Sequence, residues 1–255
     1  MRFAFAGDRD ISVSVLDFIL STGEKPLALL VSSKKKATHA NILREKCSFL
    51  NDNYVFEGTD FKNEKSIRML RALDLDFIIS VHFPYIINKE VINIPKFGFI
   101  NLHPAYLPYN KGWHTPSWAI LEGTPIGGTL HFMDEGVDSG DIILQKMIEV
   151  LPNYTADSLY RAIKECELSV FKEAWPKLLD GTYQRIKQVP FIGTFHLKRD
   201  LFCKDVQYID LEKECTPKEL INKLRALSTS SLEEAAYFEV QGRKYKIQVQ
   251  IYETE

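Results

Sequence analysis

The feature that most constrains the fold is a regular alternation of short apolar runs with helix-like segments over the first hundred residues. The apolar runs are typical of buried strands, and they comprise RFAFAG (2–7), PLALLVSS (26–33), YVFEG (54–58), LDFIISVH (75–82) and FGFINLH (97–103). The segments 8–23, 36–48 and 63–73 between them carry apolar residues near helical spacing. Because parallel strands need crossover connections, this order predicts an α/β fold: a Rossmann-like, mostly parallel sheet with helices on both faces.

The second half of the chain has a different character. Two further strands are expected in GGTLHFM (127–133) and DIILQKMIEV (141–150), followed by a long helix over 155–179. Beyond residue 188 we expect a short helix with Thr216 as its N-cap and a β-hairpin that turns at Gln241 and Gly242. The chain is therefore expected to divide into a catalytic domain over 1–185 and a small C-terminal α+β region over 186–255.

Charge and cysteine usage exclude several classes of protein. The formal net charge of −2 gives no basic footprint for nucleic acid, and the lysine cluster SSKKKATHA (32–40) is expected to be a solvated loop. The four cysteines are scattered, which argues against a zinc ribbon or a disulfide framework and fits reduced thiols in a cytoplasmic protein. No signal peptide and no apolar run of membrane-spanning length is recognised, so no membrane association is expected.

Asn101 and His103 are the residues whose placement suggests chemistry. They lie two apart at the end of an expected strand, so both side chains lie on one face, and the carboxyl ends of such strands face the ligand crevice. An amide can donate to an oxyanion and an imidazole can accept a proton, which is a combination suited to acyl transfer. Asp138, in EGVDSGDI, is a candidate to orient the histidine. A structural role in capping loops and ending a strand remains the alternative.

Two other kinds of site are weighed on the same residues. Histidines with a carboxylate are also metal ligands, but no H-x-D, H-x-E or H-E-x-x-H spacing is present, so no metal is expected. The loop AGDRDIS (6–12) occupies the phosphate position of doubly wound folds without the G-x-G-x-x-G pattern. Backbone amides and Arg9 could hold an anion there, and a surface turn is the alternative.

Two stretches of the chain resemble the formyltransferase family. They are NLHPAYLPYNKGWHTPSWAILEG (101–123) and PIGGTLHFMDEGVDSGDIILQ (125–145), and they are similar to the signature shared by glycinamide ribonucleotide, methionyl-tRNA and sugar N-formyltransferases. The matching positions are Asn101, His103, Pro104, Leu107, Pro108, Gly112, Gly127, Thr129, His131, Asp138 and Gly140. The similarity extends through most of the first 180 residues. One departure is Ala105, where the family often has serine after His-Pro.

The resemblance implies transfer of a formyl group from 10-formyltetrahydrofolate to an amine, with no metal. It places the catalytic residues of the family on Asn101, His103 and Asp138. It also implies that the segment SVHFPYIIN (80–88) holds the pterin through its main chain at Phe83, Tyr85 and Ile87.

The sugar branch of the family is the most similar. It implies a nucleotide-linked amino sugar as acceptor, in particular dTDP-4-amino-4,6-dideoxyglucose or a 3-amino relative, as in the biosynthesis of lipopolysaccharide O-antigens. Tyr109 and Trp113 offer flat faces for such a substrate, and Arg9 or Lys111 is expected near its diphosphate. The apolar face of the C-terminal hairpin must be covered, so a homodimer is expected. Another folate-dependent formyltransferase, of the methionyl-tRNA or glycinamide ribonucleotide type, or a non-catalytic folate-binding relative remains the alternative.

Overall fold

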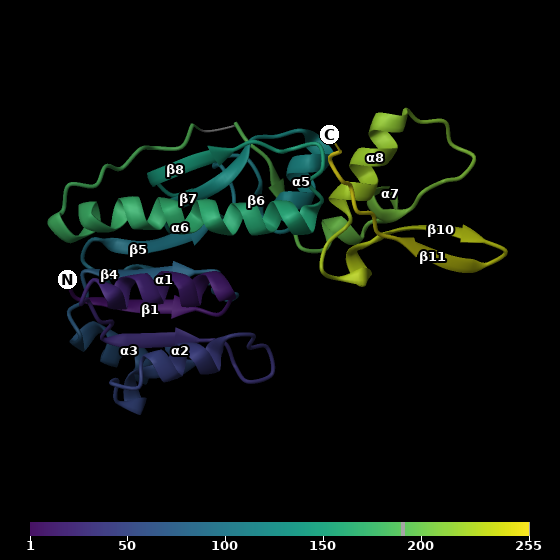
Figure 1. Ribbon diagram of the computed structural model, residues 1–255. Helices are drawn as coiled ribbons and strands as arrows, with labels where there is room; N and C mark the ends of the chain where they lie inside the picture. The colour runs from purple at the N-terminus through teal and green to yellow at the C-terminus, as the bar shows by residue number, and fades with distance from the viewer. Residues whose placement is uncertain (190–191, 255) are drawn as a thin grey trace. The chain divides into compact units, whose positions relative to one another are not determined.

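The computed structural model describes residues 1–189 and 192–254, and its main element is a seven-stranded sheet (Figure 1). In spatial order the strands are β3 (Val55–Glu57), β2 (Ala28–Val31), β1 (Phe3–Gly7), β4 (Phe77–Val81), β5 (Gly98–His103), β7 (Ile126–Phe132) and β8 (Ile142–Ile148). The first five pair in parallel, and β7 is antiparallel to β5. The predicted mostly parallel α/β fold is thereby confirmed.

Helices cover both faces of the parallel part of the sheet, as the period-2 pattern of the strands requires. On β1, Phe3 lies on the face where α1 (Asp10–Ser21) and α6 (Ala156–Asp180) pack, and its ring centroid is 5.7 Å from that of Trp175 on α6. Ala4 and Ala6 belong to the core of the opposite face, together with Ile67 and Leu70 of α3 and Val91 of α4. The remaining helical segments of this part are α2 (Ala40–Lys46), α3 (Glu64–Ala72), α4 (Lys89–Ile92), η1 (Asp52–Tyr54) and η2 (Asp60–Lys62).

The sheet order places a switch point between β1 and β4. From β1 the chain proceeds to β2 on one side, and it later returns to β4 on the other side, so the connections leave the carboxyl ends of β1 and β4 in opposite directions. Ser12 holds the two strand ends together. Its hydroxyl accepts hydrogen bonds from the N–H groups of Asp8 (3.1 Å) and Arg9 (3.2 Å) and donates to the carbonyl of Val81 (2.6 Å). A side chain at Gly7 would approach Ser12 within 2.8 Å, which accounts for the glycine.

The chain forms two compact units, each built from segments that are not contiguous in sequence. The first contains residues 1–103, 129–145 and 167–188, and the second contains residues 104–128, 146–166 and 189–255. The last of these boundaries lies close to residue 185, and the division into 1–185 and 186–255 stays a prediction.

The second unit contains one helix that the sequence pattern did not indicate. After the loop 104–114, in which the Leu107–Pro108 peptide bond is cis, α5 runs over Thr115–Glu122. It has Pro116 in its first turn, where no intrahelical partner for an N–H is needed, and it ends at Gly123, whose φ is 66°. Eight residues are too few for a clear helical periodicity next to a loop rich in proline.

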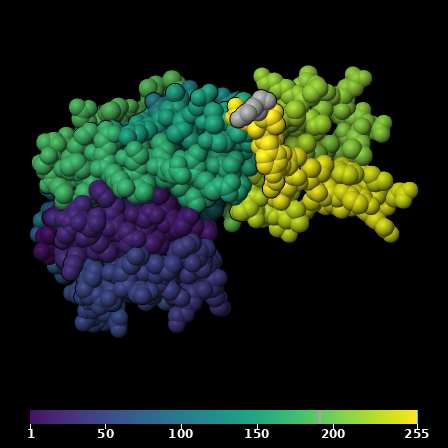
Figure 2. Space-filling model, in the orientation of Figure 1, coloured from purple at the N-terminus to yellow at the C-terminus, as the bar shows by residue number. Residues whose placement is uncertain are grey.

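The C-terminal part of the second unit follows the sequence expectation closely. Its elements are β6 (Lys111–Gly112), β9 (Phe195–His196), η3 (Asp200–Phe202), α7 (Lys204–Gln207), α8 (Pro217–Ala226), η4 (Leu232–Glu234), β10 (Ala236–Val240) and β11 (Arg243–Ile247). Thr216 caps α8 by accepting a hydrogen bond from the N–H of Glu219 at 3.2 Å, and β10 and β11 form the predicted hairpin. The chain after β11, yellow in Figure 2, returns along the end of α8, where the N–H of Val249 donates to Ser228 Oγ at 2.8 Å. A small core of Trp118, Leu201, Leu227 and Ala236 holds these elements together.

Among the residues that the structure describes, no helix is both long enough and apolar enough to span a bilayer.

Candidate active site

The end of β5 presents Asn101 and His103 on one face of the sheet. Asn101 is half-buried and His103 is 6 % exposed. The antiparallel pairing of β5 with β7 sets Asn101 directly opposite His131 and His103 opposite Thr129. Side chains directly opposite one another lie on the same face of a sheet, so the register brings a second imidazole to the amide.

His131 is buried and its ring is held in one orientation. The Nδ1 atom lies 2.8 Å from the carbonyl oxygen of Phe132, so Nδ1 carries the proton and donates. Nε2 is then an acceptor for Asn101 Nδ2, which lies 3.4 Å away. Complete burial lowers the pKa of His131 to about 4, although the charge of Asp138 acts in the opposite direction. His131 is therefore neutral at physiological pH, and it fixes which end of the Asn101 side chain is the amide nitrogen.

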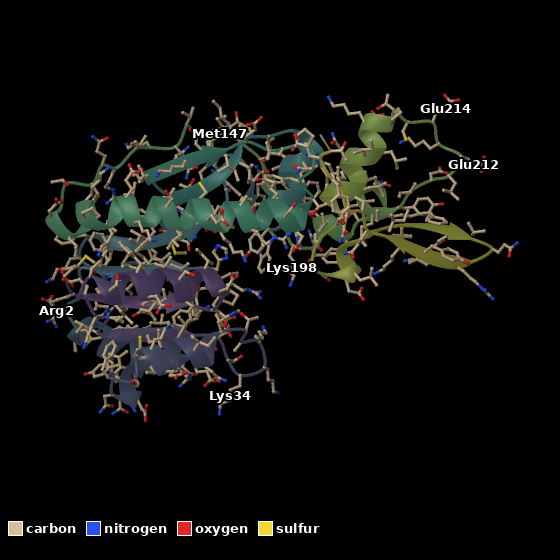
Figure 3. The ribbon with its side chains drawn as sticks, viewed as in Figure 1. Arg2, Lys34, Met147, Lys198, Glu212 and Glu214 are labelled. Carbon is tan, nitrogen blue, oxygen red and sulfur yellow. The ribbon has the colours of Figure 1, made fainter. Side chains whose placement is uncertain are left out.

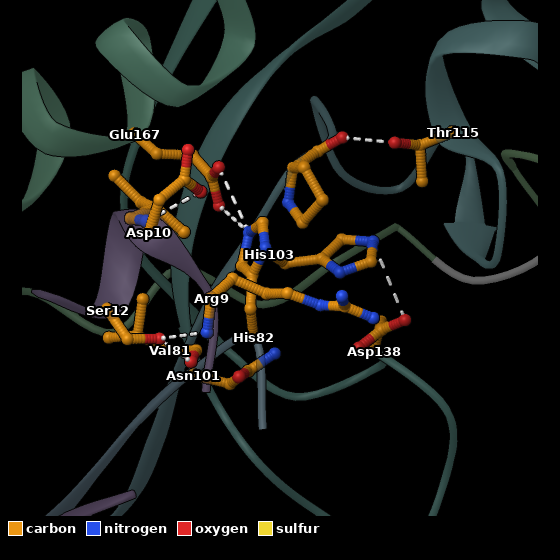
Figure 4. Close-up of polar contacts among 12 residues, drawn as sticks. Arg9, Asp10, Ser12, Val81, His82, Asn101, His103, Thr115, Asp138 and Glu167 are labelled. Carbon is orange, nitrogen blue, oxygen red and sulfur yellow. Dashed lines mark hydrogen bonds and ion pairs between the residues drawn. The ribbon is translucent and has the colours of Figure 1, made fainter. Parts of the chain in front are cut away.

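Asp138 lies between the two imidazoles. Its Oδ2 is 3.6 Å from His103 Nε2 and its Oδ1 is 3.7 Å from His131 Nε2 (Figure 4). The side chain of Asp138 is 16 % exposed, so its charge is only partly screened by solvent. Such a carboxylate stabilises a protonated His103 and holds its ring in place.

The loop that carries Asp138 is braced from two sides. Within the loop, the carboxylate of Asp134 accepts hydrogen bonds from the N–H of Gly136 (3.0 Å) and the hydroxyl of Ser139 (2.7 Å). From outside it, Gln188 Nε2 donates to the main-chain carbonyls of Asp138 and Gly140, each at 2.8 Å. Gly140 has no space for a side chain, since a Cβ there would lie 2.0 Å from the carbonyl oxygen of Phe132. This close approach explains the glycine of the Asp-x-Gly pattern.

A second histidine stands at the neighbouring strand end. His82 directly follows β4, and its Nε2 lies 2.8 Å and 3.0 Å from the two carboxylate oxygens of Glu167 on α6 (Figure 4). His82 and His103, which end adjacent parallel strands, were expected to converge, and both lie at the same edge of the sheet. The ion pair with Glu167 was not expected from the sequence.

The side chains of the segment assigned to the pterin point into the protein. The ring centroids of Phe83 and Tyr85 are 5.0 Å apart, both rings pack against Phe61, and Ile87 is 7 % exposed. The N–H of Ser33 donates to the hydroxyl of Tyr85 at 3.1 Å. These side chains act as anchors, so contacts with a ligand are left to the main chain, as the resemblance implied for Phe83, Tyr85 and Ile87.

The residues assigned to the nucleotide sugar are divided between the two units. Arg9 lies in the first unit, is exposed, and immediately precedes α1. Tyr109, Lys111 and Trp113 lie in the second, where Lys111 belongs to β6. Trp113 is 44 % exposed, and Nζ of Lys198 (labelled in Figure 3) lies 5.0 Å from the centroid of its ring. Their roles remain proposals.

No cluster of three or more histidine, cysteine, aspartate or glutamate side chains with a geometry suited to a metal ion occurs within residues 1–189 and 192–254.

Family models match almost the whole length of the chain. The model described as formyl transferase matches residues 1–175, and the one described as N-formyltransferase dimerization C-terminal domain matches residues 203–253. The chain thus belongs to the formyl transferase family. A methionyl-tRNA formyltransferase of Agathobacter rectalis is 27 % identical over 252 residues, which cover 97 % of this chain and 79 % of that protein.

Solved structures of sugar N-formyltransferases share the fold over its full length. A sugar N-formyltransferase from a Shewanella species superimposes with a TM-score of 0.82 at 23 % identity, and it covers 100 % of this chain and 99 % of its own. A 4-N formyltransferase from Francisella tularensis gives a TM-score of 0.79 at 26 % identity, with 99 % of each chain covered. The formyltransferase PseJ from Anoxybacillus kamchatkensis, solved with a UDP-linked 4-formamido sugar and tetrahydrofolate, gives 0.57 at 25 % identity, over 88 % of this chain and 98 % of its own.

Proposed function

We propose that the protein transfers the formyl group of 10-formyltetrahydrofolate to the amine of a nucleotide-linked amino sugar, with dTDP-4-amino-4,6-dideoxyglucose or a 3-amino relative as the first candidates. The observation that carries this proposal is the arrangement of Asn101, His103 and Asp138 at one sheet edge, with His131 behind the amide. The similarity to the 4-N formyltransferase from Francisella tularensis, over 99 % of each chain, supports a sugar acceptor.

In the proposed reaction the unprotonated amine of the sugar attacks the formyl carbon, and a new C–N bond forms. Asn101 donates one N–H to His131, and its second N–H is available to the formyl oxygen, which gains negative charge as the bond forms. His103 accepts the proton that the amine loses. It later delivers that proton to the folate nitrogen as the C–N bond to the donor breaks.

Asp138 makes the protonated state of His103 affordable during this exchange. At 3.6 Å its carboxylate favours the imidazolium, and with His131 neutral no second positive charge competes for it. The folate ring is proposed to bind along the main chain of Phe83, Tyr85 and Ile87. Arg9 or Lys111 is proposed to contact the diphosphate, and Tyr109 or Trp113 to contact the remainder of the sugar nucleotide.

Methionyl-tRNA is the second candidate acceptor, because the relative from Agathobacter rectalis is similar over 97 % of this chain. A formal charge of −2 weakens that candidate, since binding to a nucleic acid draws most of its affinity from positive charge.

A panel of acceptors tests the proposal. The protein is incubated with 10-formyltetrahydrofolate and, separately, dTDP- and UDP-linked 3-amino and 4-amino sugars, glycinamide ribonucleotide and methionyl-tRNA. We expect the mass of one formyl group to be added to an amino sugar. Formylation of methionyl-tRNA alone, or of none of the acceptors, would contradict the proposal.

A further inference from the structure

The pair formed by His82 and Glu167 is buried and lies outside the three residues assigned to catalysis. The Glu167 side chain is fully buried and that of His82 is 7 % exposed. Both carboxylate oxygens of Glu167 lie within 3.0 Å of His82 Nε2. The pair joins the carboxyl end of β4 to α6, across 85 residues of sequence.

Fold stability alone does not account for this pair. Removing two such groups from water is costly, and apolar residues of similar volume often serve a protein core as well or better. His82 carries a second cost, because its φ of 50° lies in the left-handed region that side chains other than glycine adopt rarely. Unfavourable backbone geometry of this kind persists where the surroundings enforce it, and it concentrates at ligand sites.

The segment that leaves His82 is held firmly at both ends. Before it, the carbonyl of Val81 accepts the hydrogen bond from Ser12; after it, Asn88 begins α4. Phe83, Tyr85 and Ile87 anchor their side chains in the core that also contains Phe61.

The peptide groups of this segment are nevertheless unpaired. The main-chain N–H and C=O groups of residues 84–87 make no hydrogen bond with the rest of the described chain, and Ile86 is 86 % exposed. A fixed backbone with unpaired donors and acceptors suits a flat heterocycle that presents donors and acceptors on its own edge, as a pterin ring does.

We infer that the His82–Glu167 pair is a positioning device for the folate. It fixes the turn at the end of β4, so that the peptide groups of residues 83–87 meet the pterin in one orientation. This inference rests on the proposed function and extends it to two residues that do not touch the reacting atoms. Preorganisation of this kind lowers the cost of ordering the segment when the ligand binds, so its loss weakens folate binding and leaves the chemical step largely intact.

The test measures folate binding and turnover separately. Tetrahydrofolate binding is followed by calorimetry, and initial rates give kcat together with the KM values for 10-formyltetrahydrofolate and for the nucleotide sugar. The variants are His82→Gly, Glu167→Leu and Glu167→Gln. Glycine accepts the left-handed φ without strain but removes the ion pair, and glutamine keeps an acceptor for His82 without the charge.

For His82→Gly and Glu167→Leu we expect the Kd for tetrahydrofolate and the KM for 10-formyltetrahydrofolate to rise about tenfold, with kcat and the KM for the sugar within about twofold of wild type. Glu167→Gln should lie between these variants and the wild type. Asp74→Gly is the matched control: Asp74 has a φ of 51° and pairs with Lys96 at 2.6 Å on the surface. This control should leave all four constants unchanged.

The outcomes separate the two proposals. If the wild type binds tetrahydrofolate and His82→Gly or Glu167→Gln, folded by circular dichroism, binds it equally well, the positioning role is wrong and the proposed function stands. An equal loss of kcat and of both KM terms would identify the pair as a general packing feature and would also overturn the inference. A wild type that binds no tetrahydrofolate contradicts the proposed function, and the inference falls with it.

Discussion

At the scale of single residues, the two imidazoles at the sheet edge differ in the environment that their positions in the fold provide. His131 is completely buried and faces a main-chain carbonyl, so it stays neutral and serves to orient Asn101. His103 lies at the end of β5, 3.6 Å from a carboxylate, where a proton can be taken up and returned. The register of β5 and β7 produces this division of roles.

The depressed pKa of His131 predicts how stability depends on pH. The folded protein binds this proton only near pH 4, whereas the unfolded chain binds it near pH 6.5. The contribution is therefore complete above pH 6.5 and is lost as the pH falls from 6.5 to 4. At pH 4.5 it amounts to about 2–3 kcal/mol of unfolding free energy.

Urea unfolding of the wild type and of His131→Gln at pH 7.5 and 4.5 checks this. The variant should lose less stability between the two pH values by roughly that amount. An identical pH dependence in both proteins would show that His131 titrates normally.

The three candidate catalytic residues are tested by truncation. We expect Asn101→Ala, His103→Ala and Asp138→Ala each to fold and to lower formyl transfer by about 10²-fold or more, because each removes an oxyanion donor, a base or the group that orients the base. His39→Ala is a control, since His39 lies on a loop and contacts Thr38 through its ring. Near-normal turnover of His103→Ala would exclude its role as the base.

At the scale of elements, the loop 134–141 depends on a residue that lies 50 positions further along the chain. Gln188 donates to two carbonyls of that loop, so it determines where the Asp138 carboxylate stands relative to His103. The same loop approaches β7 so closely that only glycine fits at position 140.

Gln188→Leu removes both hydrogen bonds and keeps most of the volume. We expect kcat to fall about tenfold, with little change in the KM for either substrate, because Asp138 is displaced and the binding surfaces are not. Gln248→Leu is the matched control, since Gln248 also donates its amide N–H to a main-chain carbonyl, that of Thr229. Equal kcat values for the two variants would remove Gln188 from the catalytic arrangement.

At the scale of the whole molecule, the C-terminal hairpin leaves apolar side chains uncovered. Val240 and Tyr245 are 41 % and 44 % exposed, and Leu232 before the hairpin is 59 % exposed. An isolated two-stranded hairpin with such a face is marginally stable in water. The match of residues 203–253 to a dimerization domain supports the proposal that a second copy of the chain covers this face.

We therefore expect a dimer at micromolar concentration by multi-angle light scattering, and Tyr245→Glu should shift it toward the monomer because a charge would be buried at the contact. Phe49→Glu is a control of similar exposure in the first unit and should leave the mass unchanged. A monomeric wild type would contradict the proposed dimer.

The amino-acid sequence by itself determined the elements and the faces of the strands. The spacing of apolar residues is local information, so it located β1, β2, β4 and β5, the long helix α6 and the final hairpin, and it placed Asn101 and His103 on one face. Short elements were harder to predict, and α5 was missed because eight residues beside a proline-rich loop give too little periodicity.

Only the tertiary structure decided which residues complete the site. His131 meets Asn101 across 30 residues, Gln188 meets Asp138 across 50 and Glu167 meets His82 across 85. A period of 2 or 3.6 residues states which way a side chain points, but it carries no record of the distant element that stands opposite. That partner is set by sheet order, register and helix packing, which minimise the free energy of the whole chain rather than of any one segment.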